Sequence, residues 1–161
     1  MLVAGRKVGI SREWLQDEIG LEKIGEYAFD SDRKMMSVIY EQGTRIKNDQ
    51  TFTPGSTFIL AKGAPERILK NCTSYLPHST SGSYKDLPNL SSSPLSDEIV
   101  EKISNESSSM AHLGLRVLAF AIRIVTSSEA SEIIKSNKSV NSETNLTFVG
   151  LIGLIGMIQD F

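Results

Sequence analysis

The feature that most constrains the fold is a nearly unbroken apolar run from Arg116 to Val125, which follows a glycine at position 114. The run has the length of a strand, and it is rich in β-branched residues that favour extended backbone. Alternation of apolar and polar residues, which marks a strand with one solvated face, is missing from it. The sequence therefore predicts a strand that is buried on both faces of its sheet.

The rest of the chain predicts more strands and a smaller number of helices, all within the length of one domain of 161 residues. Apolar, β-rich segments predict strands over Ile24–Phe29, Met35–Tyr40, Thr57–Ala61 and Leu146–Ile158. Helical spacing and capping residues predict helices over Leu2–Val8, from Ser11 to Gly20, over Ala64–Cys72, and from Ser96 to Gly114. We therefore expect an α+β fold, in which a mostly antiparallel twisted sheet is flanked by helices.

Two polar segments interrupt this pattern. Residues 77–94 are rich in Ser and Pro, and residues 126–145 are polar, with one helical turn predicted around 130–134. Long insertions at the surface cost little stability, because the entropy of closing a loop rises slowly with its length. We expect both segments to be surface insertions in a single domain that spans residues 1–161.

Composition excludes several classes of protein. A net charge of −2 does not favour binding to nucleic acid, and one cysteine, Cys72, excludes an internal disulfide and a cysteine-based zinc cluster. The longest apolar run, Thr147 to Ile158, contains three glycines and is shorter than the roughly 20 residues of a membrane helix. The phosphate-binding GxxxxGK[ST] pattern does not occur, so the P-loop class is excluded as well.

Two segments carry residue types suited to a nucleotide. Phe29 offers a flat apolar face on which a purine can stack, and Met36 lies on the same side of its strand as Lys34. Lys62 follows an apolar strand and precedes Gly63, at a helix start that favours anions. Taken singly, each has a more ordinary explanation: a core aromatic, a solvated charge, or an edge-strand lysine that keeps a sheet soluble.

A third segment begins at Gly114 and includes Arg116, whose guanidinium suits phosphate oxygens. The same arginine is equally compatible with an ion pair to an acid of the preceding helix. The order of the three segments, Phe29–Val38, Lys62–Glu66 and Gly114–Ala119, resembles the nucleotide-binding domain of P-type cation-transporting ATPases. The resemblance is closest to the calcium-pump-like, type II branch of that family.

This resemblance implies a role for each matching residue. It implies that Phe29 stacks on adenine, that Lys62 lies deep in the adenine pocket, and that Lys34 is a cation near the nucleotide. It further implies that Arg116 reaches the phosphate chain. The walls of the pocket would be lined by Met36, Gly63, Ala64 and Leu118.

The resemblance also implies a larger context. The ligand would be ATP with Mg²⁺, and the partners would be the phosphorylation, actuator and transmembrane domains of one ATP-driven pump at the cytosolic face of a membrane. Calcium is the expected ion. The Asp-Lys-Thr-Gly-Thr segment that carries the phosphorylated aspartate does not occur in the 161 residues. We therefore expect an excised domain that binds ATP without hydrolysing it and has no catalytic or metal-ligating residue of its own. The alternatives are a domain from a sodium or proton pump, or a non-enzymatic α+β interaction module.

Overall fold

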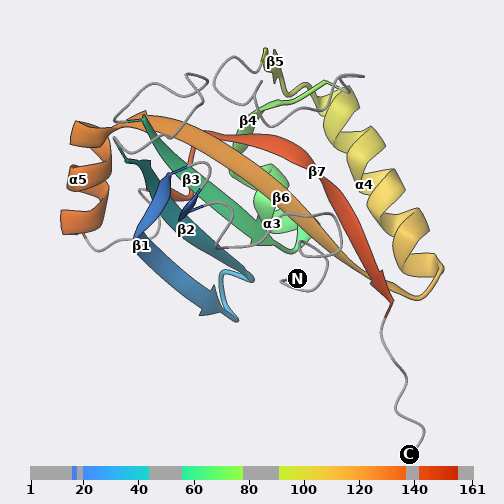
Figure 1. Ribbon diagram of the computed structural model, residues 1–161. Helices are drawn as coiled ribbons and strands as arrows, with labels where there is room; N and C mark the ends of the chain where they lie inside the picture. The colour runs from blue at the N-terminus through green and yellow to red at the C-terminus, as the bar shows by residue number, and fades with distance from the viewer. Residues whose placement is uncertain (1–15, 18–19, 44–55, 78–90, 137–141, 156–161) are drawn as a thin grey trace, which may run out of the picture.

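The computed structural model describes residues 16–17, 20–43, 56–77, 91–136 and 142–155. In these ranges one seven-stranded sheet has the order β1-β2-β3-β6-β7-β4-β5 (Figure 1). The strands are β1 Leu21–Asp30, β2 Met35–Gln42, β3 Ser56–Gly63, β4 Cys72–Tyr75, β5 Ser93–Pro94, β6 Leu115–Thr126 and β7 Leu146–Ile155. The helices are α3 Pro65–Lys70, α4 Asp97–His112 and α5 Ser127–Ser136. All strand pairs are antiparallel except β4 with β7, which confirms the expected α+β fold.

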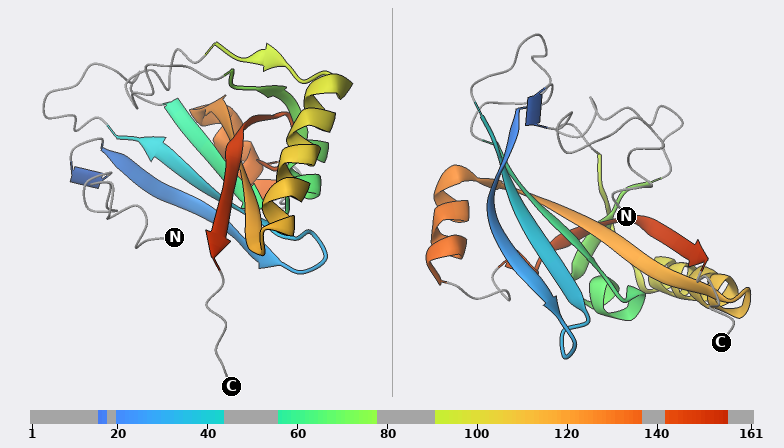
Figure 2. Two further views of the ribbon diagram at one scale, coloured as in Figure 1. Left: turned by 90° about the vertical axis from the view of Figure 1, so that its right-hand side faces the viewer. Right: turned by 60° about the horizontal axis from the view of Figure 1, so that its bottom comes forward.

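The apolar run of the sequence forms β6, the central strand of the sheet. Its two faces differ in cover. Ala119 and Ala121 on one face are buried, whereas on the other face Ile122 is buried, Phe120 is half-buried and Ile124 is 46% exposed. The prediction of burial on both faces is therefore wrong for part of the strand. The reason is that the described helices pack against one face of the sheet (Figure 2).

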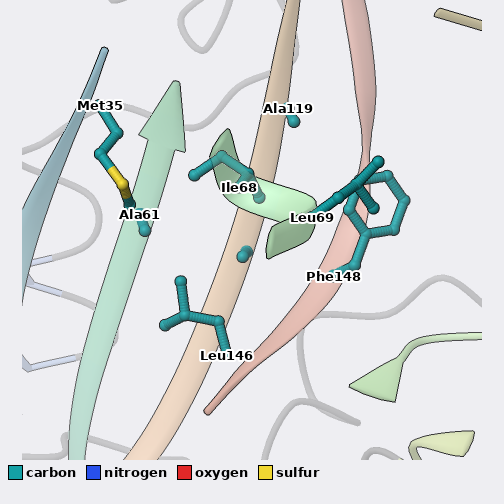
Figure 3. Packing of buried hydrophobic residues seen from close by; sticks show 8 residues of the cluster. Met35, Ala61, Ile68, Leu69, Ala119, Leu146 and Phe148 are labelled. Atoms are coloured by element: carbon teal, nitrogen blue, oxygen red, sulfur yellow. The ribbon is translucent and has the colours of Figure 1, made fainter. Parts of the chain in front are cut away.

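The covered face holds two apolar clusters. In the first, shown in Figure 3, Ile68 and Leu69 of α3 pack over β3, β6 and β7. Ile103 of α4 is partly buried against the same cluster. The second joins β2, β3 and β6 to Ala130 and Ile133 of α5. These clusters anchor all three helices, because a short helix gains most of its stability from packing its apolar side.

Helix α5 corrects the prediction for residues 126–145. A single helical turn was expected in a polar insertion, but α5 runs from Ser127 to Ser136 and buries Ala130 and Ile133. Only two apolar residues of the helix are buried, so its periodic signal is weak among the serines. The apolar surface of β2, β3 and β6 provides the packing partner that stabilises it.

Other boundaries were predicted in part. The Ser96 hydroxyl caps α4 by accepting a hydrogen bond from the Ile99 backbone N–H at 3.4 Å, and Gly114 ends the helical segment with a φ of +77°. Helix α3 ends at Lys70, two residues before the predicted end at Cys72, because Cys72 begins β4. Strands β4 and β5 were not predicted, since four and two residues carry too little pattern.

The helix predicted over Leu2–Val8 lies outside the described residues, as does most of the one predicted from Ser11. The final strand is described as far as Ile155, and its predicted continuation to Ile158 also lies outside. In the described ranges, no helix is long and apolar enough to cross a membrane.

Candidate functional site

A cavity of about 470 Å³ lies over the sheet face opposite to the helices. Its volume falls in the range of roughly 300–1,000 Å³ that is usual for small-molecule sites. The structure brings together at this cavity all eight residues that were predicted from the sequence. Two apolar residues that were not predicted, Val117 and Leu154, complete the lining. The full lining is Phe29, Lys34, Met36, Lys62, Gly63, Ala64, Arg116, Val117, Leu118 and Leu154.

Strand register explains why residues from distant segments meet here. Met36 of β2 lies directly opposite Lys62 of β3, and Lys62 lies opposite Phe120 of β6. Directly paired residues point to the same face of a sheet, and so do residues two apart on one strand. Leu118 and Arg116 therefore share the face of Met36 and Lys62. Met35, next to Met36, points the other way into the core.

Phe29 lies in an irregular part of the β1–β2 hairpin. The register shifts between Tyr27 and Asp30, so that Ala28 and Phe29 together lie opposite Met36. A bulge of this kind turns the following side chain out of the regular pleat. The Phe29 side chain is 60% exposed while lining the cavity. An exposed aromatic face beside Met36 is the arrangement that base stacking requires.

Three cations line the cavity, from Lys34, Lys62 and Arg116, and none of the ten lining residues is acidic. Strand β3 lies between β2 and β6, so Lys62 is not on an edge strand and that alternative is wrong. No carboxylate of the described helix α4 pairs with Arg116, which removes the second alternative for this residue. The lining thus combines an apolar floor with a local excess of positive charge that suits an anionic ligand.

Gly63 allows the end of β3 to approach the β1–β2 turn. A Cβ atom at this position would lie 2.5 Å from the Lys34 carbonyl oxygen and 2.6 Å from Met35 Cβ. The next residue, Ala64, donates its backbone N–H to the Lys34 oxygen at 2.9 Å. Lys34 itself has a φ of +54°, a left-handed conformation that side chains seldom adopt. The turn and the start of α3 are therefore held in contact at one end of the cavity.

Arg33 has an environment that the sequence did not reveal. The Arg33 guanidinium does not line the cavity, although Lys34 beside it does. Its Nη1 donates to both carboxylate oxygens of Glu143, at 2.6 and 2.5 Å. Glu143 is 4% exposed. No local pattern in residues 142–145 marks this glutamate as a partner of Arg33, which is 110 positions earlier in the sequence.

The arrangement suits a ligand with a flat apolar part and an anionic tail. Phe29, Met36 and Leu118 offer apolar contact, and the lysines and the arginine offer charge-assisted hydrogen bonds. Among the described residues there is no group of three or more His, Cys, Asp or Glu side chains that could hold a metal ion. The residues that line the cavity are suited to binding and orienting such a ligand.

Comparison with known proteins gives the same family as the motifs. The family model described as "P-type ATPase, cytoplasmic domain N" matches residues 1–160. A sodium/potassium exporting P-type ATPase of Schizosaccharomyces pombe, cta3, is 34% identical over 119 residues, which are 74% of this chain and 9% of that protein. Calcium-transporting ATPase 1 of Bacillus cereus is 30% identical over 128 residues, 80% of this chain and 12% of that protein. Sodium/potassium exporting P-type ATPase 1 of Saccharomyces cerevisiae is 34% identical over 131 residues, 79% of this chain and 10% of that protein.

Proposed function

We propose that this chain, which belongs to the family of P-type ATPase cytoplasmic N domains, binds ATP in the cavity between Phe29 and Arg116. One observation carries the proposal: the eight residues chosen by motif resemblance come from separate segments and all line one cavity. Adenine stacks on Phe29 beside Met36, and the phosphates extend toward Arg116 and Lys34. Stacking of this kind contributes roughly 1–3 kcal/mol per base.

The chain spans about a tenth of the length of the curated relatives it matches. The full reaction is therefore part of the proposal and not of what this chain shows. We propose that the domain presents ATP to an aspartate of a separate phosphorylation domain, at the cytosolic face of a membrane. Actuator and transmembrane domains would couple this step to cation transport. Mg²⁺ would arrive bound to the phosphates, since the cavity lining has no acidic residue to hold it. The contribution of this chain is to hold the nucleotide in one orientation.

Two candidate ions have separate support. Calcium follows from the motif resemblance and from the name of the Bacillus cereus relative. Sodium or potassium follows from the two yeast relatives, whose names state that activity. The membrane helices of a pump select its ion, so the test belongs to the complete pump that carries this domain. Stimulation of its ATPase activity by calcium alone supports the first candidate, and stimulation by sodium or potassium supports the second.

Nucleotide binding can be tested on the 161-residue chain by NMR titration with ATP and GTP. We expect saturable shifts at Phe29, Lys62 and Leu118 with ATP, and a dissociation constant on the order of 1 mM, equivalent to about −4 kcal/mol. GTP should bind more weakly, because the base is expected to supply most of the contact. Phe29→Ala should remove most of the response, while Ile124→Ala, on the same strand as Leu118 but outside the cavity, should not. A lack of saturable shifts would leave the interaction-module alternative.

A further inference from the structure

The guanidinium of Arg33 connects two parts of the chain next to the proposed adenine site. Its Nη2 donates to the carbonyl oxygen of Ala28 at 2.7 Å, and its Nη1 donates to both oxygens of Glu143. Ala28 precedes Phe29, and these two residues form the bulge opposite Met36. The carbonyl that Arg33 holds is therefore part of the peptide group that leads directly into Phe29.

The side chain of Glu143, which binds the Arg33 guanidinium, is itself held in place by its surroundings. This side chain is buried, and one of its carboxylate oxygens also accepts a hydrogen bond from the Ser37 hydroxyl at 3.0 Å. Ser37 is fully buried in β2 and lies 3.4 Å from the hydroxyl of Ser142, also fully buried. A buried carboxylate with two kinds of donor has little freedom to move. Arg33 thus links the bulge to the interior of the domain.

Phe29 is the residue that such a link would steady, because more than half of it is exposed. Phe29 is 60% exposed, so packing restrains its side chain only in part. The other end of the turn is held separately: the Asp30 carboxylate accepts the backbone N–H groups of Asp32 and Arg33 at 2.8 and 2.9 Å. Lys34 is held through its own backbone. Neither set of bonds reaches the Ala28 carbonyl.

We propose that Arg33 and Glu143 are positioning residues for the nucleotide site, which hold the backbone at Ala28 and thereby set the orientation of the Phe29 ring. The inference rests on the proposed nucleotide-binding function. Arg33 acts through Phe29 and not by contact with the ligand, because its guanidinium is bound to Glu143 and does not line the cavity. Orienting an exposed aromatic in advance lowers the entropy lost when the base stacks on it.

The first test needs no nucleotide. In the NMR spectrum of the 161-residue chain, Arg33→Met should broaden or shift the signals of the Phe29 ring. It should also lower the order parameters of the backbone amides of Ala28 and Phe29. Arg33→Lys keeps the charge but cannot make the same forked contacts, so it should have a smaller effect on the Phe29 signals. It replaces Arg33→Met as the test variant if Arg33→Met folds poorly. Ile133→Ala, a buried change in α5, is the control for lost stability. Unchanged Phe29 signals in both Arg33 variants would overturn the inference, whether or not ATP binds.

The second test is a double-mutant cycle in nucleotide affinity. It is measured under conditions in which all the variants are folded. Arg33→Met should raise the dissociation constants of AMP and ATP by the same factor, about fivefold to tenfold, as expected for coupled neighbours. The same change in a Phe29→Ala background should have little further effect. Equal losses in both backgrounds would show that Arg33 does not act through Phe29. A loss confined to ATP would indicate direct phosphate contact instead.

These two tests separate the inference from the function on which it rests. If ATP does not bind the unmodified chain but Arg33→Met still disturbs Phe29, the proposed function fails and the structural link stands. If ATP binds and neither the Phe29 signals nor the cycle responds to Arg33→Met, the positioning inference fails and nucleotide binding stands.

Discussion

A methyl group on Gly63 would lie 2.5 Å from the carbonyl oxygen of Lys34, closer than a real Cβ atom approaches another heavy atom. Both residues line the cavity, so its shape depends on the missing side chain at position 63. The atom that the added methyl group would meet is a backbone oxygen, which cannot move aside as the end of a flexible side chain can. The close approach also allows Ala64 N–H to bond to the Lys34 oxygen.

Gly63→Ala should therefore destabilise the domain by about 1–3 kcal/mol, the usual cost of forcing extra volume into a packed position. It should also weaken ATP binding, because relief of the clash displaces the turn that carries Lys34. Urea unfolding and NMR titration measure the two effects. Gly150→Ala in β7 is the matched control, since a Cβ there would meet nothing within 4 Å. Equal stability of the two variants would contradict the argument.

Removal of Arg116 should discriminate among nucleotides. The side chain is exposed at the cavity and is assigned to the phosphate chain, so Arg116→Ala should weaken ATP and ADP more than AMP. Phe29→Ala should weaken all three alike, because the stacking surface is common to them. Calorimetric titration with the three nucleotides gives both comparisons. An equal loss for the three nucleotides in Arg116→Ala would show that this arginine has a structural role.

Loss of the buried Glu143 carboxylate should be costly. Glu143→Ala removes the buried carboxylate that pairs with Arg33 and accepts the Ser37 hydroxyl, so we expect a destabilisation of about 3 kcal/mol. Lys102→Ala breaks the ion pair between Lys102 and Glu98 on the exposed side of α4, and it should leave the unfolding midpoint almost unchanged. Thermal or urea unfolding of both variants provides the measurement. Similar unfolding midpoints for Glu143→Ala and Lys102→Ala would indicate that the buried Glu143 carboxylate contributes nothing to the stability of the domain.

Asp30 should make the stability of the domain depend on pH in the acid range. Its carboxylate accepts the backbone N–H groups of Arg33 and Asp32, which hold the pKa of Asp30 below its ordinary value. The stabilisation is complete above the unfolded pKa of about 3.9 and is lost as the pH falls through the lower folded pKa. Asp30→Asn should therefore flatten the decline in stability below about pH 4. An identical pH profile in the variant would show that other carboxylates carry the dependence.

Cys72 should be unreactive in the folded domain. Burial raises the pKa of its thiol to about 12, so the nucleophilic thiolate is scarce near neutral pH. Alkylation by iodoacetamide at pH 8 should be slow in the native chain and fast once urea unfolds it. Mass spectrometry of the modified protein follows both rates. Rapid alkylation of the native chain would mean that β4 opens readily at Cys72, its first residue.

Much of the fold and of the cavity lining could be predicted because the signals are local. β-branched runs predicted β2, β3 and β6, a serine cap predicted the start of α4, and the order of three short motifs predicted the eight lining residues. These features depend on neighbouring residues, whose strand pairing then brings Met36, Lys62 and Leu118 to one face. The sequence by itself thus identified eight of the ten lining residues, and it missed Val117 and Leu154.

Tertiary structure alone decided how those residues are held. The Arg33–Glu143 pair joins positions 110 apart in the chain, and the bulge at Phe29 depends on the register between β1 and β2. Helix α5 is stable because its two buried residues meet an apolar surface on β2, β3 and β6. Contacts between distant segments form only after the sheet has brought those segments together, and a pattern read over a few neighbouring residues does not contain them.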